Sequence, residues 1–221
     1  MKNIISPKTT EVSLDDLLTA LSLDKKDDAT DEIKSILDEV NKIATPKAVF
    51  MPLKPIANNE IIVLNDIELK EPFVYEMLLN KEIVVPYVAT CGVEIEKWSN
   101  SLTDFFNQFV VENLKQLYLR LMVKELFAVI KSKYFKGYSY ISTINPGSLN
   151  DWAIAGQAPL FEIFGDVENN IGVTLKDNFF MTPAKSVSGI IFQTDEQCSN
   201  CLLCTRTDCP TRIKPYIEGY V

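Results

Sequence analysis

Histidine is absent from this chain of 221 residues. Its absence excludes histidine acid–base catalysis, the Ser-His-Asp triad and histidine metal ligands, so any chemistry here uses cysteines, carboxylates, lysines, tyrosines, hydroxyls or a borrowed cofactor. Basic residues are also scarce, because 22 Lys and Arg against 30 Asp and Glu leave a formal net charge of −8. Affinity for a phosphate backbone depends on cationic side chains, so no nucleic-acid partner is expected.

Long hydrophobic runs are missing too. No apolar stretch approaches the roughly 20 residues that span a bilayer, and residues 1–10 hold no apolar signal-peptide core. No internal repeat or low-complexity stretch is present. We therefore expect a cytoplasmic protein with no membrane partner. Apolar residues make up 47% of the chain, which is enough for a hydrophobic core and excludes intrinsic disorder.

The N-terminal region predicts two helices. Ser13 precedes two acidic residues and leucines at helical spacing, as expected of an N-cap. Thr30 is predicted to cap a second helix that ends before Pro46. Its amphipathic stripe is formed by Ile33, Ile36, Leu37, Val40 and Ile43.

The middle of the chain predicts strands at 61–64 and 83–88, where β-branched residues cluster. Pro86 predicts that the second strand lies at a sheet edge or ends early. A long helix is then expected from Ser101 or Thr103 to Ile130. Its predicted buried stripe is Phe106, Phe109, Val110, Leu114, Leu117 and Leu121.

Strands are expected again at 138–144, 172–175 and 187–192, with a short helix at 160–164. Helices group early and no βαβ alternation is present, so the fold class is α+β. Three regions are expected. They are an N-terminal helical and strand region at 1–80, packed on a core at 81–195, and a cysteine-rich tail at 196–221.

The tail carries the strongest chemical signal. Four thiols at close spacing, with a proline after the last, can surround one metal ion or one cluster: Cys198, Cys201, Cys204 and Cys209. We favour an iron–sulfur cluster. The alternatives are a structural zinc site or no metal at all, the thiols then being free or in disulfides. Arg206 and Arg212 offset thiolate charge in one interpretation and are ordinary surface residues in the other. Cys91 stands apart after a strand and is interpreted as a small buried hydrophobe.

Two stretches resemble a known family. The first is Asn145-Pro146-Gly147-Ser148-Leu149-Asn150-Asp151-Trp152. The second runs from Ile171 through Met181-Thr182 to the segment Pro183, Ala184, Lys185, Ser186, Val187, Ser188 and Gly189. They resemble the activation (reactivation) domain of cobalamin-dependent methionine synthase, and most closely its short stand-alone relatives with a cysteine-rich tail. The firm match covers Tyr138 to Phe192.

The resemblance implies a twisted antiparallel sheet with a long central helix and N-terminal helices. It also implies a groove for S-adenosylmethionine and a surface that caps cobalamin held by a partner protein. In that family, the cofactor is repaired after Co(I) is oxidised to Co(II). One electron is added and a methyl group is transferred from S-adenosylmethionine, which restores methylcobalamin. The implied cofactor-binding residues are Asp151, Trp152 and the segment from Pro183 to Gly189.

Small residues suit that role. A Ser-Val-Ser-Gly strand lets a flat macrocycle approach the backbone, and Ser186 and Ser188 share one face because strand side chains alternate. Their hydroxyls could bond corrin amides or the carboxylate of the methyl donor; the alternative is a well-packed strand with a tight turn. Trp152 either covers a ligand or belongs to the core, and Asp151 either pairs with a sulfonium or caps a helix. Glu125 either faces the groove or is solvated.

The sequence departs from the family pattern at three positions. Thr143 stands where the family has an arginine that binds the carboxylate of S-adenosylmethionine, and Ser148 stands where it has a tyrosine. Thr182 replaces the tryptophan before the motif proline. Because an arginine–carboxylate pair is a strong charge-assisted bond, these changes put S-adenosylmethionine binding in doubt.

These observations lead to two alternative hypotheses about the function. The first is a reactivation module for methionine synthase or another corrinoid methyltransferase, with the cysteine cluster as electron source and a reductase as a further partner. The second is a non-catalytic module that binds or chaperones a corrinoid protein and uses its four cysteines as a structural metal site.

Overall fold

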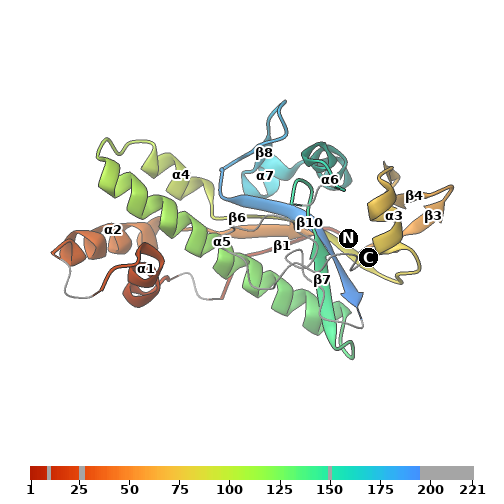
Figure 1. Cartoon of the computed structure of the whole chain (residues 1–221), viewed down its shortest axis with the longest axis horizontal. Helices are drawn as coiled ribbons and strands as arrows, with labels where there is room; N and C mark the ends of the chain where they lie inside the picture. The colour runs from red at the N-terminus through yellow and green to blue at the C-terminus, as the bar shows by residue number, and fades with distance from the viewer. Residues whose placement is uncertain (9–10, 25–27, 149–150, 195–221) are drawn as a thin grey trace.

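A five-stranded antiparallel sheet forms the centre of the computed structural model, which describes residues 1–8, 11–24, 28–148 and 151–194 (Figure 1). Its spatial order is β1-β2-β6-β10-β7, so strands distant in sequence lie side by side. The strands are β1 (Asn3–Ile5), β2 (Lys47–Phe50), β6 (Val84–Thr90), β7 (Tyr140–Ile144) and β10 (Ser186–Thr194). The first eighty residues therefore contribute two strands to the same sheet as the rest.

One face of this sheet is covered by helices α1 (Leu14–Leu21), α2 (Thr30–Ile43) and α5 (Phe105–Tyr134). Helix α5 has 30 residues and lies across the strands (Figure 1). Asp104 caps it by accepting a hydrogen bond from the Asn107 backbone N–H. Residues four apart along α5 are buried against the sheet in a row: Val110, Leu114, Tyr118, Met122, Leu126 and Ile130.

The opposite face carries two smaller core clusters. They are built from a three-stranded sheet, β3 (Ile56–Asn58), β4 (Ile61–Leu64) and β5 (Ile67–Leu69), and from short helices. The helices are α3 (Pro72–Leu78), η1 (Ile154–Gly156), α6 (Gln157–Phe164) and α7 (Val167–Ile171). Helix α4 (Val93–Ser99) follows β6, and a two-stranded hairpin of β8 (Thr174–Leu175) and β9 (Met181–Thr182) precedes β10. Among the described residues, no helix is long and apolar enough to cross a membrane.

The predicted α+β class is confirmed, and so are the N-cap at Ser13 and the strand at 61–64. Three local expectations were wrong, and the first two concern helices. Thr30 does not cap α2, because the helix begins at Thr30 and Ala29 occupies the cap position. Phe109 is 53% exposed, because the buried row of α5 is rotated from the predicted one.

Pro86 does not mark a sheet edge, because β6 lies between β2 and β10. Met51 donates its backbone N–H to the Pro86 carbonyl at 3.1 Å, so the backbone polar positions of Pro86 face the end of β2. Pairing with β10 continues through Pro86, opposite Ile190. Proline has no backbone N–H to donate to a neighbouring strand. It is tolerated in this central strand because its backbone faces β2, and β2 ends there, so no pairing is lost.

Candidate functional site

The predicted segment from Pro183 to Gly189 enters strand β10, which has two neighbouring strands along only part of its length. Strand β10 pairs with β6 along Ser186–Phe192, but with β7 only from Ile190 onward. Cys91 donates its backbone N–H to the Lys185 carbonyl at 3.0 Å, so alternation directs the backbone groups of Ser186 and Ser188 away from β6. In the part of the chain that is described, no strand pairs with β10 on that side before Ile190.

Exposure varies along this segment. Ala184 is exposed, and Lys185, Ser186 and Val187 are half-buried. Pro183, Ser188 and Gly189 are buried. Val187 packs toward the core under α5, so Ser186 and Ser188 share the opposite face, as alternation predicted.

A cavity of about 500 Å³ opens beside the start of β10. Its walls come from four places: the end of α4, the start of α6, the β8–β9 hairpin and the segment before β10. The lining residues are Glu96, Asn100, Gln157, Lys176, Phe180, Met181, Thr182, Ala184 and Ser186. This volume is in the range of ordinary small-molecule sites, which cover roughly 300–1,000 Å³.

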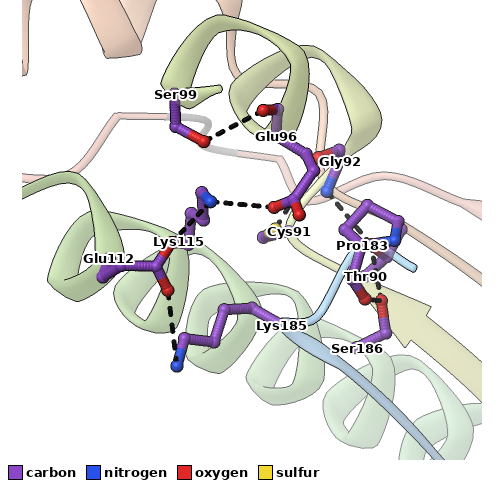
Figure 2. Close-up of polar contacts among 10 residues, drawn as sticks. All are labelled: Thr90, Cys91, Gly92, Glu96, Ser99, Glu112, Lys115, Pro183, Lys185 and Ser186. Atoms are coloured by element: carbon purple, nitrogen blue, oxygen red, sulfur yellow. Dashed lines mark hydrogen bonds and ion pairs between the residues drawn. The ribbon is translucent and has the colours of Figure 1, made fainter. Parts of the chain in front are cut away.

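Hydrogen bonds hold Ser186, which lines the cavity, in place. Ser186 donates to the Pro183 carbonyl at 2.8 Å, and its oxygen lies 2.9 Å from the Thr90 hydroxyl (Figure 2). The Gly92 backbone N–H donates to the Thr90 hydroxyl at 3.3 Å. Ser186 is thus held to the end of β6 by hydrogen bonds, and the loop before it is tied to the strand.

Charged side chains from α4, α5 and the segment before β10 form a chain of ion pairs, and one of them, Glu96, lines the cavity (Figure 2). Lys115 on α5 has a side chain only 3% exposed, and its Nζ lies 2.8 Å from Glu96 Oε2 and 2.6 Å from Glu112 Oε1. Glu112 Oε2 in turn lies 3.7 Å from Lys185 Nζ. Burial lowers the pKa of Lys115, but its hydrogen bonds to Glu112 and Glu96 and their negative charges outweigh burial, so its pKa is raised.

Cys91 lies under this chain of charges. Its side chain is fully buried, and burial, with Glu96 as a second cause, raises its thiol pKa to about 12. A thiol with this pKa stays protonated at neutral pH, and the thiolate is the reactive form. Cys91 is therefore a packing residue, as the sequence predicted.

Asn145 closes the gap where β7 ends. Its side-chain N–H groups donate to the Tyr87 hydroxyl and to the Ser188 carbonyl, each at 2.8 Å. Thr143 lies 3.4 Å from the same Tyr87 hydroxyl. A Cβ on Gly189 would lie 2.3 Å from Asn145 Nδ2 and 2.5 Å from the Ile144 carbonyl oxygen. The missing side chain at Gly189 thus makes room for Asn145 and the end of β7.

Three further residues singled out in the sequence, Asp151, Trp152 and Glu125, are not among the residues that line the cavity. Asp151 is exposed, whereas Trp152 is fully buried among Ile144, Leu160 and other core residues. Glu125 has a side chain 22% exposed, and Lys8 lies 3.9 Å from its carboxylate. Cys198, Cys201, Cys204, Cys209, Arg206 and Arg212 lie outside the described residues.

Sequence reasoning missed several residues of this site, among them Glu96, Lys115 and Gln157. One signal was present. Lys115 follows Val111 by four residues and precedes Leu119 by four, so the apolar periodicity placed a lysine on a buried stripe. A lysine there requires acidic partners. No pattern pointed to Glu96 or Gln157, because short helices from distant parts of the chain bring them together.

No protein-family model matches the sequence, and no curated protein matches it. Among solved structures, the chain is similar to one described as the MetH reactivation domain bound to AdoHcy. The TM-score is 0.65 at 13% identity, over 90% of this chain and 80% of that chain. The resemblance predicted from two short sequence stretches is thus confirmed for the fold, an antiparallel α+β arrangement with a long helix.

Proposed function

We propose that this chain is a reactivation module for a cobalamin-dependent methyltransferase, either methionine synthase or another corrinoid enzyme. It docks on the partner's cobalamin-binding domain and supports the return of Co(II) to the active cofactor. The observation that carries the proposal is the open cavity beside Thr182, Ala184 and Ser186, on a fold similar to that of a reactivation domain.

The site is suited to receive a large ring from outside. Ala184 is exposed and small, and Phe180 is 60% exposed at the rim of the cavity. The cavity therefore offers apolar contact to the edge of a macrocycle, and its hydroxyl, amide and carboxylate groups can orient the ring. The net charge of −8 favours a basic partner surface, through complementary potentials.

A second candidate function is a non-catalytic module that holds a corrinoid protein. It is favoured by Thr143, which replaces the family's arginine with a short hydroxyl 3.4 Å from Tyr87. The carboxylate of S-adenosylmethionine would find no guanidinium at this position, so the binding function does not require that methyl donor.

Docking is tested by titrating the protein into a corrinoid-loaded partner, with the visible and EPR spectra of Co(II) as the readout. We expect the wild-type protein to change the Co(II) spectrum saturably. Ala184→Arg places a bulky cation at the cavity mouth and is expected to weaken binding about tenfold or more.

Ala57→Arg is the matched control, because Ala57 is exposed on β3 and does not line the cavity. It is expected to bind like the wild type. An unchanged Co(II) spectrum at saturating protein would refute docking. If Ala184→Arg binds as tightly as Ala57→Arg, the cavity is not the docking site.

The metal content of the tail separates the two functions. As a reactivation module, protein purified without oxygen is expected to be brown, with iron and sulfide bound by Cys198, Cys201, Cys204 and Cys209. Iron–sulfur potentials span roughly −700 to +450 mV, so a low-potential donor supplied by a reductase is within range. Elemental analysis is the measurement. A colourless protein with one zinc ion per chain would remove the electron-transfer role and favour the binding module.

A further inference from the structure

Two phenylalanine side chains are exposed at the start of helix α5. Phe105 is 85% exposed and Phe109 is 53% exposed, and they lie one turn apart on the same side of the helix. Trp98, Leu102 and Phe106, close to them in sequence, are half-buried and pack on the core under α5. We call these five residues the aromatic corner. Large apolar side chains grouped on a surface are typical of protein contact sites.

Hydrogen bonds hold the aromatic corner in one shape. Asp104 accepts a hydrogen bond from the Asn107 backbone N–H at 2.9 Å, which fixes the first turn of α5. Gln108 Nε2 donates to the Leu102 carbonyl at 2.7 Å, so the link between α4 and α5 is tied to the helix as well. Side chains presented from a fixed backbone lose less conformational entropy when they bind, which favours their use as contacts.

The aromatic corner is connected to the cavity by two routes. Glu96 and Asn100, at the end of α4, line the cavity, and the link that carries the corner follows directly. Glu112 lies on α5 less than one turn beyond Phe109, and its carboxylate is 3.7 Å from Lys185 Nζ, in the segment before β10. A protein that docks over the cavity therefore lies within reach of the corner.

The corner suits a protein surface and not a small enclosed ligand. Neither Phe105 nor Phe109 lines the cavity, and aromatic side chains that stand out from a surface can enter pockets of a partner, as the central contacts of interfaces do. The charged residues between positions 93 and 112 are Glu94, Glu96, Lys97, Asp104 and Glu112. Four carboxylates against one lysine make this region negative, so the complementary surface is apolar with a basic rim.

We propose that the aromatic corner binds the protein part of the corrinoid-loaded partner. The inference rests on the proposed function and adds to the cavity a second contact, made between the two proteins. The partner presents an apolar patch with basic residues around it, and Phe105 and Phe109 supply the affinity. The strength of docking and the change in the Co(II) spectrum therefore depend on different residues of this chain.

The test titrates full-length variants into a methionine synthase that lacks a reactivation domain and carries Co(II) cobalamin. The double change Phe105→Ala, Phe109→Ala removes both rings and keeps the helix, because alanine is the best helix former. We expect it to bind about tenfold more weakly or worse than the wild type, yet to give the same Co(II) spectrum at saturation.

Ile56→Ala combined with Tyr138→Ala is the matched control. These side chains are 62% and 39% exposed, belong neither to the aromatic corner nor to the cavity lining, and are expected to be replaceable without loss of binding. Urea unfolding midpoints close to that of the wild type show that weaker binding reflects the corner and not loss of the fold.

Equal binding by the wild type and the double phenylalanine variant would overturn the inference and leave the proposed function standing. A loss shared by the control pair, or a changed Co(II) spectrum at saturation, would also overturn it. A wild-type dimer in sedimentation that the phenylalanine changes make monomeric would assign the corner to a second copy of the chain instead. If saturating wild-type protein leaves the Co(II) spectrum unchanged, the proposed function and the inference fall together.

Discussion

Replacing Gly189 with alanine is expected to lower the free energy of unfolding by about 3 kcal/mol or more. The new Cβ would lie 2.3 Å from Asn145 Nδ2 and 2.5 Å from the Ile144 carbonyl oxygen, far inside van der Waals contact. The Asn145 side chain could swing away, but the Ile144 carbonyl is backbone and can move only if the β7–β10 pairing shifts. Moving Asn145 also breaks its hydrogen bonds to Tyr87 and to the Ser188 carbonyl.

Urea denaturation followed by circular dichroism measures this loss as a lower midpoint. Gly137→Ala is the control, because Gly137 has a φ of +104° but a Cβ added there would meet no atom within 4 Å. It should show only the cost of a strained backbone, roughly 1–2 kcal/mol. Equal losses of stability in the two variants would show that the close packing of Asn145 is not the reason why position 189 requires glycine.

Replacing Lys115 with methionine is expected to cost about 3 kcal/mol of stability. Removing one partner of a buried ion pair typically costs about 3–5 kcal/mol, because the other charge stays buried without compensation. We take the low end because the Glu112 side chain is 48% exposed and can be solvated, whereas that of Glu96 is only 20% exposed. The additional change Glu96→Gln should restore part of the loss, because it removes the uncompensated carboxylate.

The pH dependence of this effect follows from the raised pKa of Lys115. The stabilisation is fully present below the unfolded lysine pKa of 10.5 and is lost as pH rises through the higher folded pKa. The difference between wild type and Lys115→Met is therefore expected to stay constant from neutral pH to about pH 9 and to shrink only above the unfolded value.

Lys42→Met serves as the control, because Lys42 pairs with Glu39 on the surface, where both side chains are largely exposed. Its unfolding midpoint should stay close to that of the wild type, since exposed ion pairs are weak. A Lys115→Met midpoint equally close to wild type would show that the buried charges contribute little to the fold.

Several elements of the fold could be predicted because their signals are local. Ser13 caps α1 through its own hydroxyl, and the clustered β-branched residues of Ile61–Leu64 form a strand as expected. The prediction of a sheet edge at Pro86 was wrong because the effect of a proline depends on which neighbouring strand its backbone faces. Only the sheet order shows that β2 ends beside it. The prediction that Phe109 is buried was wrong because α5 is apolar on several sides, so the apolar periodicity did not identify its buried face.

The candidate site also contains residues that a local sequence pattern indicated and residues that it did not. The residue pattern singled out the segment from Pro183 to Gly189 as a candidate, and two of its residues, Ala184 and Ser186, line the cavity. Gly189 serves the packing of Asn145, a contact between residues 44 positions apart that no local pattern encodes. Glu96, Lys115 and Gln157 come from three different helices, so nothing in the sequence placed them near one another.

By itself, the sequence determined the α+β class, the absence of histidine chemistry and the small-residue strand, because composition, periodicity and alternation act over a few residues. The tertiary structure decided that, within the described residues, β7 pairs with β10 only from Ile190 onward, that a cavity opens beside the start of β10, and that Gln157 and the ion-paired Glu96 line it. These features arise where elements distant in sequence end beside one another, and only packing of the whole chain sets where they meet.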